Sequence, residues 1–148
     1  MSTRSAIGYK TQQGKIRAVY CHSDGYVKHN GRILQDNYQA AYKIAQLIEM
    51  GDLSVLDAEI GVKIDFEDRT TRAANRQCLY YGRDRGEKDA MFNAREFADT
   101  AEFVKEMENM DCEYFYLFNV REWTVCTTEF EGDFPVMKSV AEMLQLVA

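Results

Sequence analysis

The segment Tyr20–Tyr26, with the sequence YCHSDGY, carries a thiol, an imidazole and a carboxylate on Cys21, His22 and Asp24. Alternate residues of an extended chain share a face, so Asp24 is placed to orient His22 as a general acid or base. Cys21 then points to the opposite face, which disfavours a Cys–His nucleophile pair built from neighbours. These three residues are the catalytic candidates. The alternative is structural: His22 ends a strand and Asp24 forms the turn with Gly25.

Arginine density indicates a second kind of chemistry, the binding of a phosphate-bearing ligand. Arginine holds phosphate through a planar fork of donors. Acidic residues are interleaved with the arginines, and the sequence has no Gly-rich phosphate loop, so a solvated loop is the alternative interpretation. The arginines of this segment are Arg69, Arg72, Arg76, Arg83 and Arg85. The candidate ligand-binding residues are Thr3, Arg4, Tyr20, Tyr26, Arg69 and Arg72.

Metal and cofactor chemistry is not expected. A metal site would have to use His22, Asp24 and His29, whose spacing matches no zinc-binding pattern. The four cysteines form no CxxC pair, and each lies in or beside an apolar run. Such cysteines are usually reduced and buried in cytosolic proteins.

Charge is distributed unevenly along the chain. Residues 1–32 carry six basic residues and one acid, whereas residues 89–148 carry four basic residues and thirteen acids. Aromatic residues suited to stacking on bases lie in the acidic part, which repels phosphates and argues against a nucleic-acid partner. These aromatic residues are Tyr114, Phe115, Tyr116, Phe118 and Trp123, and the acids near them are Glu113, Glu122, Glu129 and Glu131. Acidity of this kind leaves two alternatives open, a DNA mimic and a surface for a basic partner.

The elements that must position these residues begin with a hairpin. Strand-like segments cover residues 3–10 and 15–22, joined by a polar turn that ends in Gly14. A helix is predicted over residues 32–50, because apolar residues recur at helical spacing, and Gly51 lies where a C-terminal cap belongs. The apolar stripe consists of Leu34, Tyr38, Ala41, Ala45 and Ile48.

The rest of the chain predicts further strands and two more helices. Strands are predicted at residues 62–66, 77–82, 112–119 and 122–130, and helices at residues 94–109 and from Pro135 onward. Residues 67–76 are polar and show no apolar periodicity. The chain of 148 residues is therefore expected to form one α+β domain, a mostly antiparallel sheet with about three helices packed on it. The N-terminus shows no signal-peptide core and no apolar run reaches membrane-spanning length, so a cytoplasmic location is expected.

The opening MSTRS and the later YCHSDGY segment resemble a family of small bacteriophage proteins of unknown function. The matching positions are Ser2, Thr3, Arg4, Tyr20, Cys21, His22, Asp24, Gly25 and Tyr26. The resemblance covers about the first third of the chain. It implies a phage origin and expression inside a bacterial host, and it implies no reaction. It also draws attention to Thr3, Arg4, His22 and Asp24 as one cluster, since adjacent hairpin strands would bring them together.

These observations lead to an expected function and two alternatives. The expected function is that of a non-catalytic phage accessory protein that binds a host macromolecule, most plausibly a protein. The first alternative is a binder or hydrolase of a nucleotide-like small molecule, in which Arg4 holds phosphate, His22 transfers a proton and Asp24 orients it. The second alternative is the acidic DNA mimic. Apolar edge strands make a homodimer conceivable.

Overall fold

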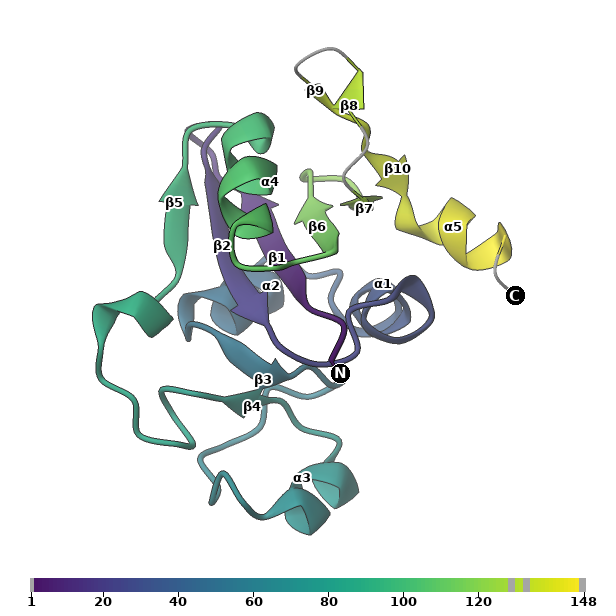
Figure 1. The fold of residues 1–148 in the computed structure, drawn as a ribbon. Coiled ribbons are helices and arrows are strands. Elements are labelled where there is room, and N and C mark those ends of the chain that lie inside the picture. The colour runs from purple at the N-terminus through teal and green to yellow at the C-terminus, as the bar shows by residue number, and fades with distance from the viewer. Residues whose placement is uncertain (1, 128–129, 132–133, 147–148) are drawn as a thin grey trace.

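A mixed β-sheet forms the centre of the fold (Figure 1). The structure is a computed structural model, and it describes residues 2–127, 130–131 and 134–146. The strands of this sheet are β1 (Ser5–Lys10), β2 (Ile16–Cys21), β3 (Leu53–Val55), β4 (Leu79–Tyr80), β5 (Arg95–Phe97), β6 (Tyr114–Phe118), β7 (Trp123–Cys126) and β10 (Lys138–Ser139). The short strands β8 (Phe130–Glu131) and β9 (Phe134–Pro135) pair with each other. The helices are α1 (Arg32–Asn37), α2 (Ala41–Glu49), α3 (Arg69–Asn75), α4 (Thr100–Glu108) and α5 (Val140–Leu146).

The strand order is β10-β7-β6-β1-β2-β3-β4, and β5 also pairs with β2. The predicted α+β class is confirmed, and most of the pairings are antiparallel, including the N-terminal hairpin of β1 and β2. The pairings of β1 with β6 and of β2 with β3 are parallel. Strand β2 pairs with two different strands along its length. Its first half pairs with β5, whereas Cys21 at its end pairs with Leu53 of β3. The described residues form five α-helices rather than about three.

The sheet separates two hydrophobic clusters, as strand alternation requires. In β1, Ala6 belongs to the smaller cluster and Ile7 to the larger one. Helix α4 contributes Phe103 to the smaller cluster, whereas α2 contributes Leu47 to the larger one. Figure 1 accordingly shows α4 and α2 on opposite faces of the sheet.

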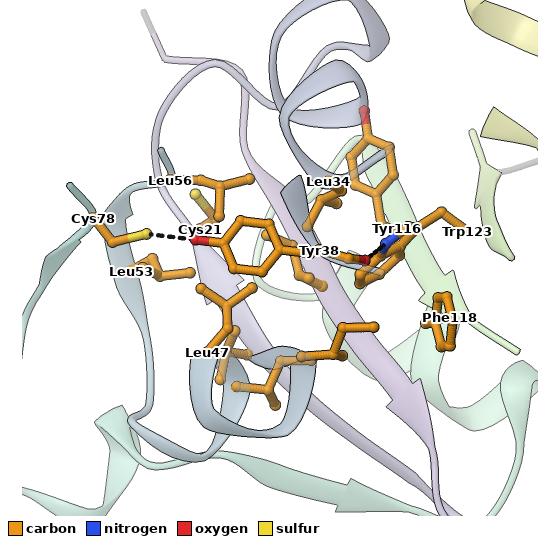
Figure 2. Packing of buried hydrophobic residues seen from close by; sticks show 14 of the residues in the cluster. Cys21, Leu34, Tyr38, Leu47, Leu53, Leu56, Cys78, Tyr116, Phe118 and Trp123 are labelled. Atoms are coloured by element: carbon orange, nitrogen blue, oxygen red, sulfur yellow. Dashed lines mark hydrogen bonds between the residues drawn. The ribbon is translucent and has the colours of Figure 1, made fainter. Parts of the chain in front are cut away.

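The predicted helix over residues 32–50 is interrupted at Tyr38. Helix α1 ends at Asn37 and α2 begins at Ala41, and a π-helical turn over Val27–Gly31 precedes α1. The Trp123 indole Nε1 donates a hydrogen bond of 2.7 Å to the Tyr38 carbonyl, which a continuous helix would have used internally (Figure 2). The Tyr38 side chain is itself fully buried, and its hydroxyl donates to the Asp57 carbonyl at 2.7 Å. A tertiary contact therefore replaces a helical hydrogen bond at Tyr38. At the other end of α2, Gly51 follows the helix with a positive φ of 96°, as expected for a C-terminal cap.

The middle of the chain differs most from its prediction. Residues 62–66 form no strand, and the segment predicted over residues 77–82 is a strand only at Leu79 and Tyr80. The polar stretch at 67–76 contains α3, which begins where the Asp68 side chain accepts a hydrogen bond from the Thr71 backbone N–H at 3.0 Å. Side-chain capping stabilises a short helix without any apolar stripe, and this is why periodicity missed α3.

The two later helices begin farther along the chain than predicted. Helix α4 starts at Thr100, where Asp99 caps it by accepting from the Glu102 N–H, and the preceding residues Arg95–Phe97 pair with β2 as a strand. Pro135 lies in β9, and α5 starts only at Val140. Two residues of the C-terminal predictions, Glu129 and Val147, lie outside the described residues. Within the described part of the chain, no helix is long and apolar enough to cross a membrane.

Candidate functional site

The YCHSDGY segment forms a tight turn packed against the start of β1. Ser5 pairs with Cys21 in the hairpin, which places Arg4 opposite His22. After His22 the chain turns at Asp24, whose φ is 55°, and the Gly25 N–H donates to the Thr3 carbonyl at 2.8 Å. The Gly25 carbonyl in turn accepts a hydrogen bond of 2.6 Å from the Tyr116 hydroxyl of β6. The expected juxtaposition of the N-terminal residues with this segment is therefore present.

Asn30 anchors the turn from the buried side, a role that no sequence pattern predicted. Its side chain is fully buried, and its amide nitrogen donates to the Ser5 hydroxyl at 3.2 Å and to the Ser23 carbonyl at 3.1 Å. The same nitrogen lies 3.6 Å from the Cys21 sulfur, and the Asn30 amide oxygen faces His29 Nδ1 at 2.9 Å. The π-helical turn supplies Asn30, so it anchors the turn after β2 to the hairpin.

Tyr20, His22 and Arg4 form a polar cluster at the end of the hairpin. The Tyr20 hydroxyl and His22 Nδ1 are 2.8 Å apart. Partial burial lowers the pKa of His22, and the nearby Arg4 charge lowers it further. Burial raises the pKa of Tyr20 to about 12, with Arg4 opposing the shift. The neutral imidazole is thus the favoured form, and it pairs with a protonated phenol.

Asp24 and Cys21 do not join this cluster. Within residues 2–127, no hydrogen bond or ion pair links Asp24 to His22, and the Asp24 side chain is exposed. The Cys21 thiol is fully buried beneath the sheet, and burial raises its pKa to about 12. A buried thiol with a raised pKa is a poor nucleophile. The arrangement therefore lacks both the oriented His–Asp pair and the reactive thiol that the sequence had raised as candidates.

Two shallow hollows adjoin the cluster. One, of about 430 Å³, is lined by Thr3 and Tyr26 together with Cys112, Glu113, Tyr114 and Thr127. The other, of about 400 Å³, is lined by Arg4 together with Ser2, Glu108, Asp111, Cys112 and Glu113. Arg4 forms an ion pair of 3.6 Å with Asp111, and Glu108 and Glu113 are exposed. These acids reduce the attraction of the second hollow for an anion.

The arginine segment lies elsewhere and largely supports its own loops. Arg69 and Arg72 are on α3, which Figure 1 shows beyond β3 and β4 and away from the hairpin. Arg72 bonds Asp57 at 3.1 Å, and Arg83 bonds Asp84 at 2.9 Å. The Arg69 guanidinium lies 5.1 Å from the centre of the Phe66 ring. The structure therefore separates Arg69 and Arg72 from the other ligand-binding candidates, and it pairs Arg72, Arg83 and Arg85 with neighbouring acids.

Neither a base-stacking platform nor a metal cluster emerges. Of the aromatic residues proposed for stacking, Phe115 is fully buried. Tyr116 and Trp123 are also fully buried and Phe118 is nearly so (Figure 2). Among the described residues, no group of three or more His, Cys, Asp or Glu side chains is arranged to hold a metal ion. Of the expected metal-site residues, His29 is bonded through Nδ1 to Asn30.

Sequence reasoning missed an apolar hollow, which we call the tip hollow. It has a volume of about 500 Å³ and lies between the β1–β2 turn, the start of α2 and the β6–β7 turn. Its lining residues are Tyr9, Lys10, Thr11, Gln12, Gln13, Ala41, Ile44, Ala45, Phe118 and Val120. Three segments distant in sequence build it, so no local pattern could have revealed it.

The Asp52–Arg95 ion pair was also missed. Both Asp52 carboxylate oxygens accept from the Arg95 guanidinium, at 2.7 and 2.8 Å, and the Tyr20 backbone N–H donates to the same carboxylate at 2.9 Å. This pair lies where β2 changes partner from β5 to β3. Its position supports the end of β2, the strand that leads into His22.

In comparisons with known proteins, no protein-family model, curated protein or solved structure matches this chain significantly. The function must therefore be argued from the residues and their geometry.

Proposed function

We propose that this chain is a non-catalytic binding protein whose partner is another protein. The tip hollow carries the proposal, because it is apolar, open and bordered by the exposed side chain of Val120. Exposed apolar surface that the fold itself does not cover is typical of interaction sites. The resemblance to small bacteriophage proteins makes a protein of the bacterial host the expected partner.

The state of the reactive side chains supports a non-catalytic role. The Cys21 thiol is buried, the exposed Asp24 forms no hydrogen bond or ion pair with His22 among the described residues, and His22 pairs with Tyr20. An acyl- or phosphoryl-transfer site needs a nucleophile, a base and a group that orients the base. Those three roles are not filled by the candidates named from the sequence.

Affinity capture from bacterial host cells tests the proposal with a matched pair of variants. Ala41 and Ala73 are both exposed helical alanines, but only Ala41 lines the tip hollow. The wild type and Ala73→Arg should retain one polypeptide in stoichiometric amount, and Ala41→Arg should lose it. Capture that is equal for all three proteins, or no stoichiometric polypeptide with any of them, would contradict the proposal.

A second candidate function is the binding of a phosphate-bearing small molecule at Arg4, Tyr20 and His22. The observation that favours it is the meeting of these three side chains at the end of the hairpin, where the Tyr20 hydroxyl contacts the imidazole and the Arg4 charge acts on both rings. Titration with AMP, followed by the NMR signals of the His22 ring, tests this function. Saturable shifts in the wild type that Arg4→Gln abolishes would support it, and unchanged His22 signals would count against it.

A further inference from the structure

Val120 adopts a backbone conformation that its side chain disfavours. It lies in the turn between β6 and β7 with a φ of 86°, in the left-handed region that glycine occupies readily. β-Branched residues are rare there. The side chain is also 69% exposed, so burial offers little compensation. Valine is thus the wrong residue for this position by the criteria of folding alone.

Asn119 explains how the turn keeps this conformation. Its side-chain oxygen accepts hydrogen bonds of 3.1 Å from the backbone N–H groups of both Arg121 and Glu122. The Asn119 N–H also donates to the Glu122 carbonyl at 3.1 Å. These bonds and the pairing of Phe118 with Trp123 fix the turn from both sides. Backbone strain that the surroundings impose in this way is concentrated at functional positions.

The strained valine stands at the rim of the tip hollow. The hollow's inner wall includes Phe118 and Ile44, which are buried, and Tyr9, which is partly buried. Val120 continues this apolar wall outward into solvent. A ligand that enters the hollow would therefore cover Val120 and pack against the inner wall at the same time.

Charges around the hollow restrict what that ligand can be. Lys10 lines it and forms no ion pair with a described residue, while Arg121 and the exposed Glu122, which follow Val120, carry opposite charges just outside the hollow. The nearest acid of α2, Glu49, is already bonded by Arg17 at 2.6 Å and by the Tyr9 hydroxyl at 3.0 Å. A carboxylate on the ligand would be attracted by the Lys10 ammonium group in the lining, whereas an ammonium group on the ligand would be repelled by it.

We propose that Val120 is a recognition residue, kept at a strained position for binding, and that the tip hollow takes an apolar segment of the partner protein that carries a carboxylate. This inference rests on the proposed function and specifies the chemistry of its partner. It also predicts that one substitution at Val120 raises the stability of the protein and weakens its binding.

The test replaces Val120 by glycine and compares it with Val62→Gly. Val62 is exposed to a similar degree, 71%, but has no positive φ and does not line the hollow. Val120→Gly should raise Tm by roughly 2–4 °C, because glycine relieves the strain. The Val62→Gly change should leave Tm equal or lower. A Tm for Val120→Gly below that of the wild type would overturn the strain argument.

Binding is measured by NMR with two small probes, 3-phenylpropanoate and 3-phenylpropylamine. The acid should shift the backbone amide signals of Ala45 and Phe118, and Val120→Gly should weaken its binding at least about 10-fold while Val62→Gly does not. The amine should bind at least about 10-fold more weakly than the acid. Equal binding of both probes, or equal binding by both variants, would overturn the inference.

Failure of this inference is distinguishable from failure of the proposed function. If neither probe binds but capture of the host polypeptide still depends on Ala41, the proposed function stands and the ligand chemistry is wrong. If Val120→Gly abolishes self-association seen by analytical ultracentrifugation, a second copy of the chain occupies the hollow and the inference is overturned.

Discussion

At the scale of single residues, Gly25 has a structural role in the turn of the YCHSDGY segment, because the start of the hairpin packs closely against it. A Cβ atom added at this position would lie 2.8 Å from the Ser5 Cβ and 2.9 Å from the Thr3 carbonyl oxygen. Neither contact is easily relieved, because both belong to the start of the hairpin and the second is with backbone. The glycine is therefore required by close approach, independently of any chemistry done by His22.

Gly25→Ala is expected to destabilise the protein by about 2 kcal/mol, the usual range for overpacking. Urea unfolding measures this change. Gly82→Ala is the matched control, since its added Cβ would meet only the Glu87 carbonyl at an ordinary 3.6 Å. The control should be neutral or stabilising by up to about 1 kcal/mol. Equal effects of the two changes would mean that the turn does not depend on this contact.

Among the elements, β2 depends on the Asp52–Arg95 ion pair. This pair lies where β2 passes from β5 to β3, and Asp52 there accepts a hydrogen bond from the Tyr20 backbone N–H. The Asp52 side chain is 4% exposed and Arg95 is 23% exposed, so removal of Arg95 would strand a buried carboxylate. Arg95→Met should therefore cost about 3 kcal/mol. The Arg17–Glu49 pair is the comparison, because its side chains are 27% and 42% exposed, and Arg17→Met should cost less than about 1 kcal/mol. Chemical denaturation of both variants provides the measurement, and equal losses would refute the assigned role of the Asp52 pair.

Local signals predicted elements well where local interactions decide them. The β1–β2 and β6–β7 hairpins follow from strand alternation and turn residues, and so does Gly51 as a helix cap. The break at Tyr38 could not be predicted, because it depends on a hydrogen bond from Trp123, far along the chain. The clustering of Arg4 with His22 was predictable from hairpin register. The tip hollow was not, since it requires the relative placement of three distant segments.

The whole molecule buries its cysteines in both clusters on either side of the sheet, and this links stability to pH. Burial raises the pKa of Cys21 and Cys112 from 9.0 to about 12, and that of Cys78 from 9.0 to about 11. The unfolded chain therefore loses these protons at a lower pH than the folded protein. Stability from this source is complete below pH 9 and falls as the pH rises toward the folded values.

We expect the free energy of unfolding to fall between pH 8 and pH 10 by about 1 kcal/mol for each of these three thiols. Urea titrations across this range measure the slope. Cys112→Ala supplies the control: the loss of packing lowers stability at every pH, but the removal of one titrating thiol should reduce the fall between pH 8 and pH 10 by about 1 kcal/mol. A slope that does not change in this variant would show that the Cys112 thiol ionises equally in the folded and unfolded states, and its burial would then have no bearing on the alkaline limit of the fold.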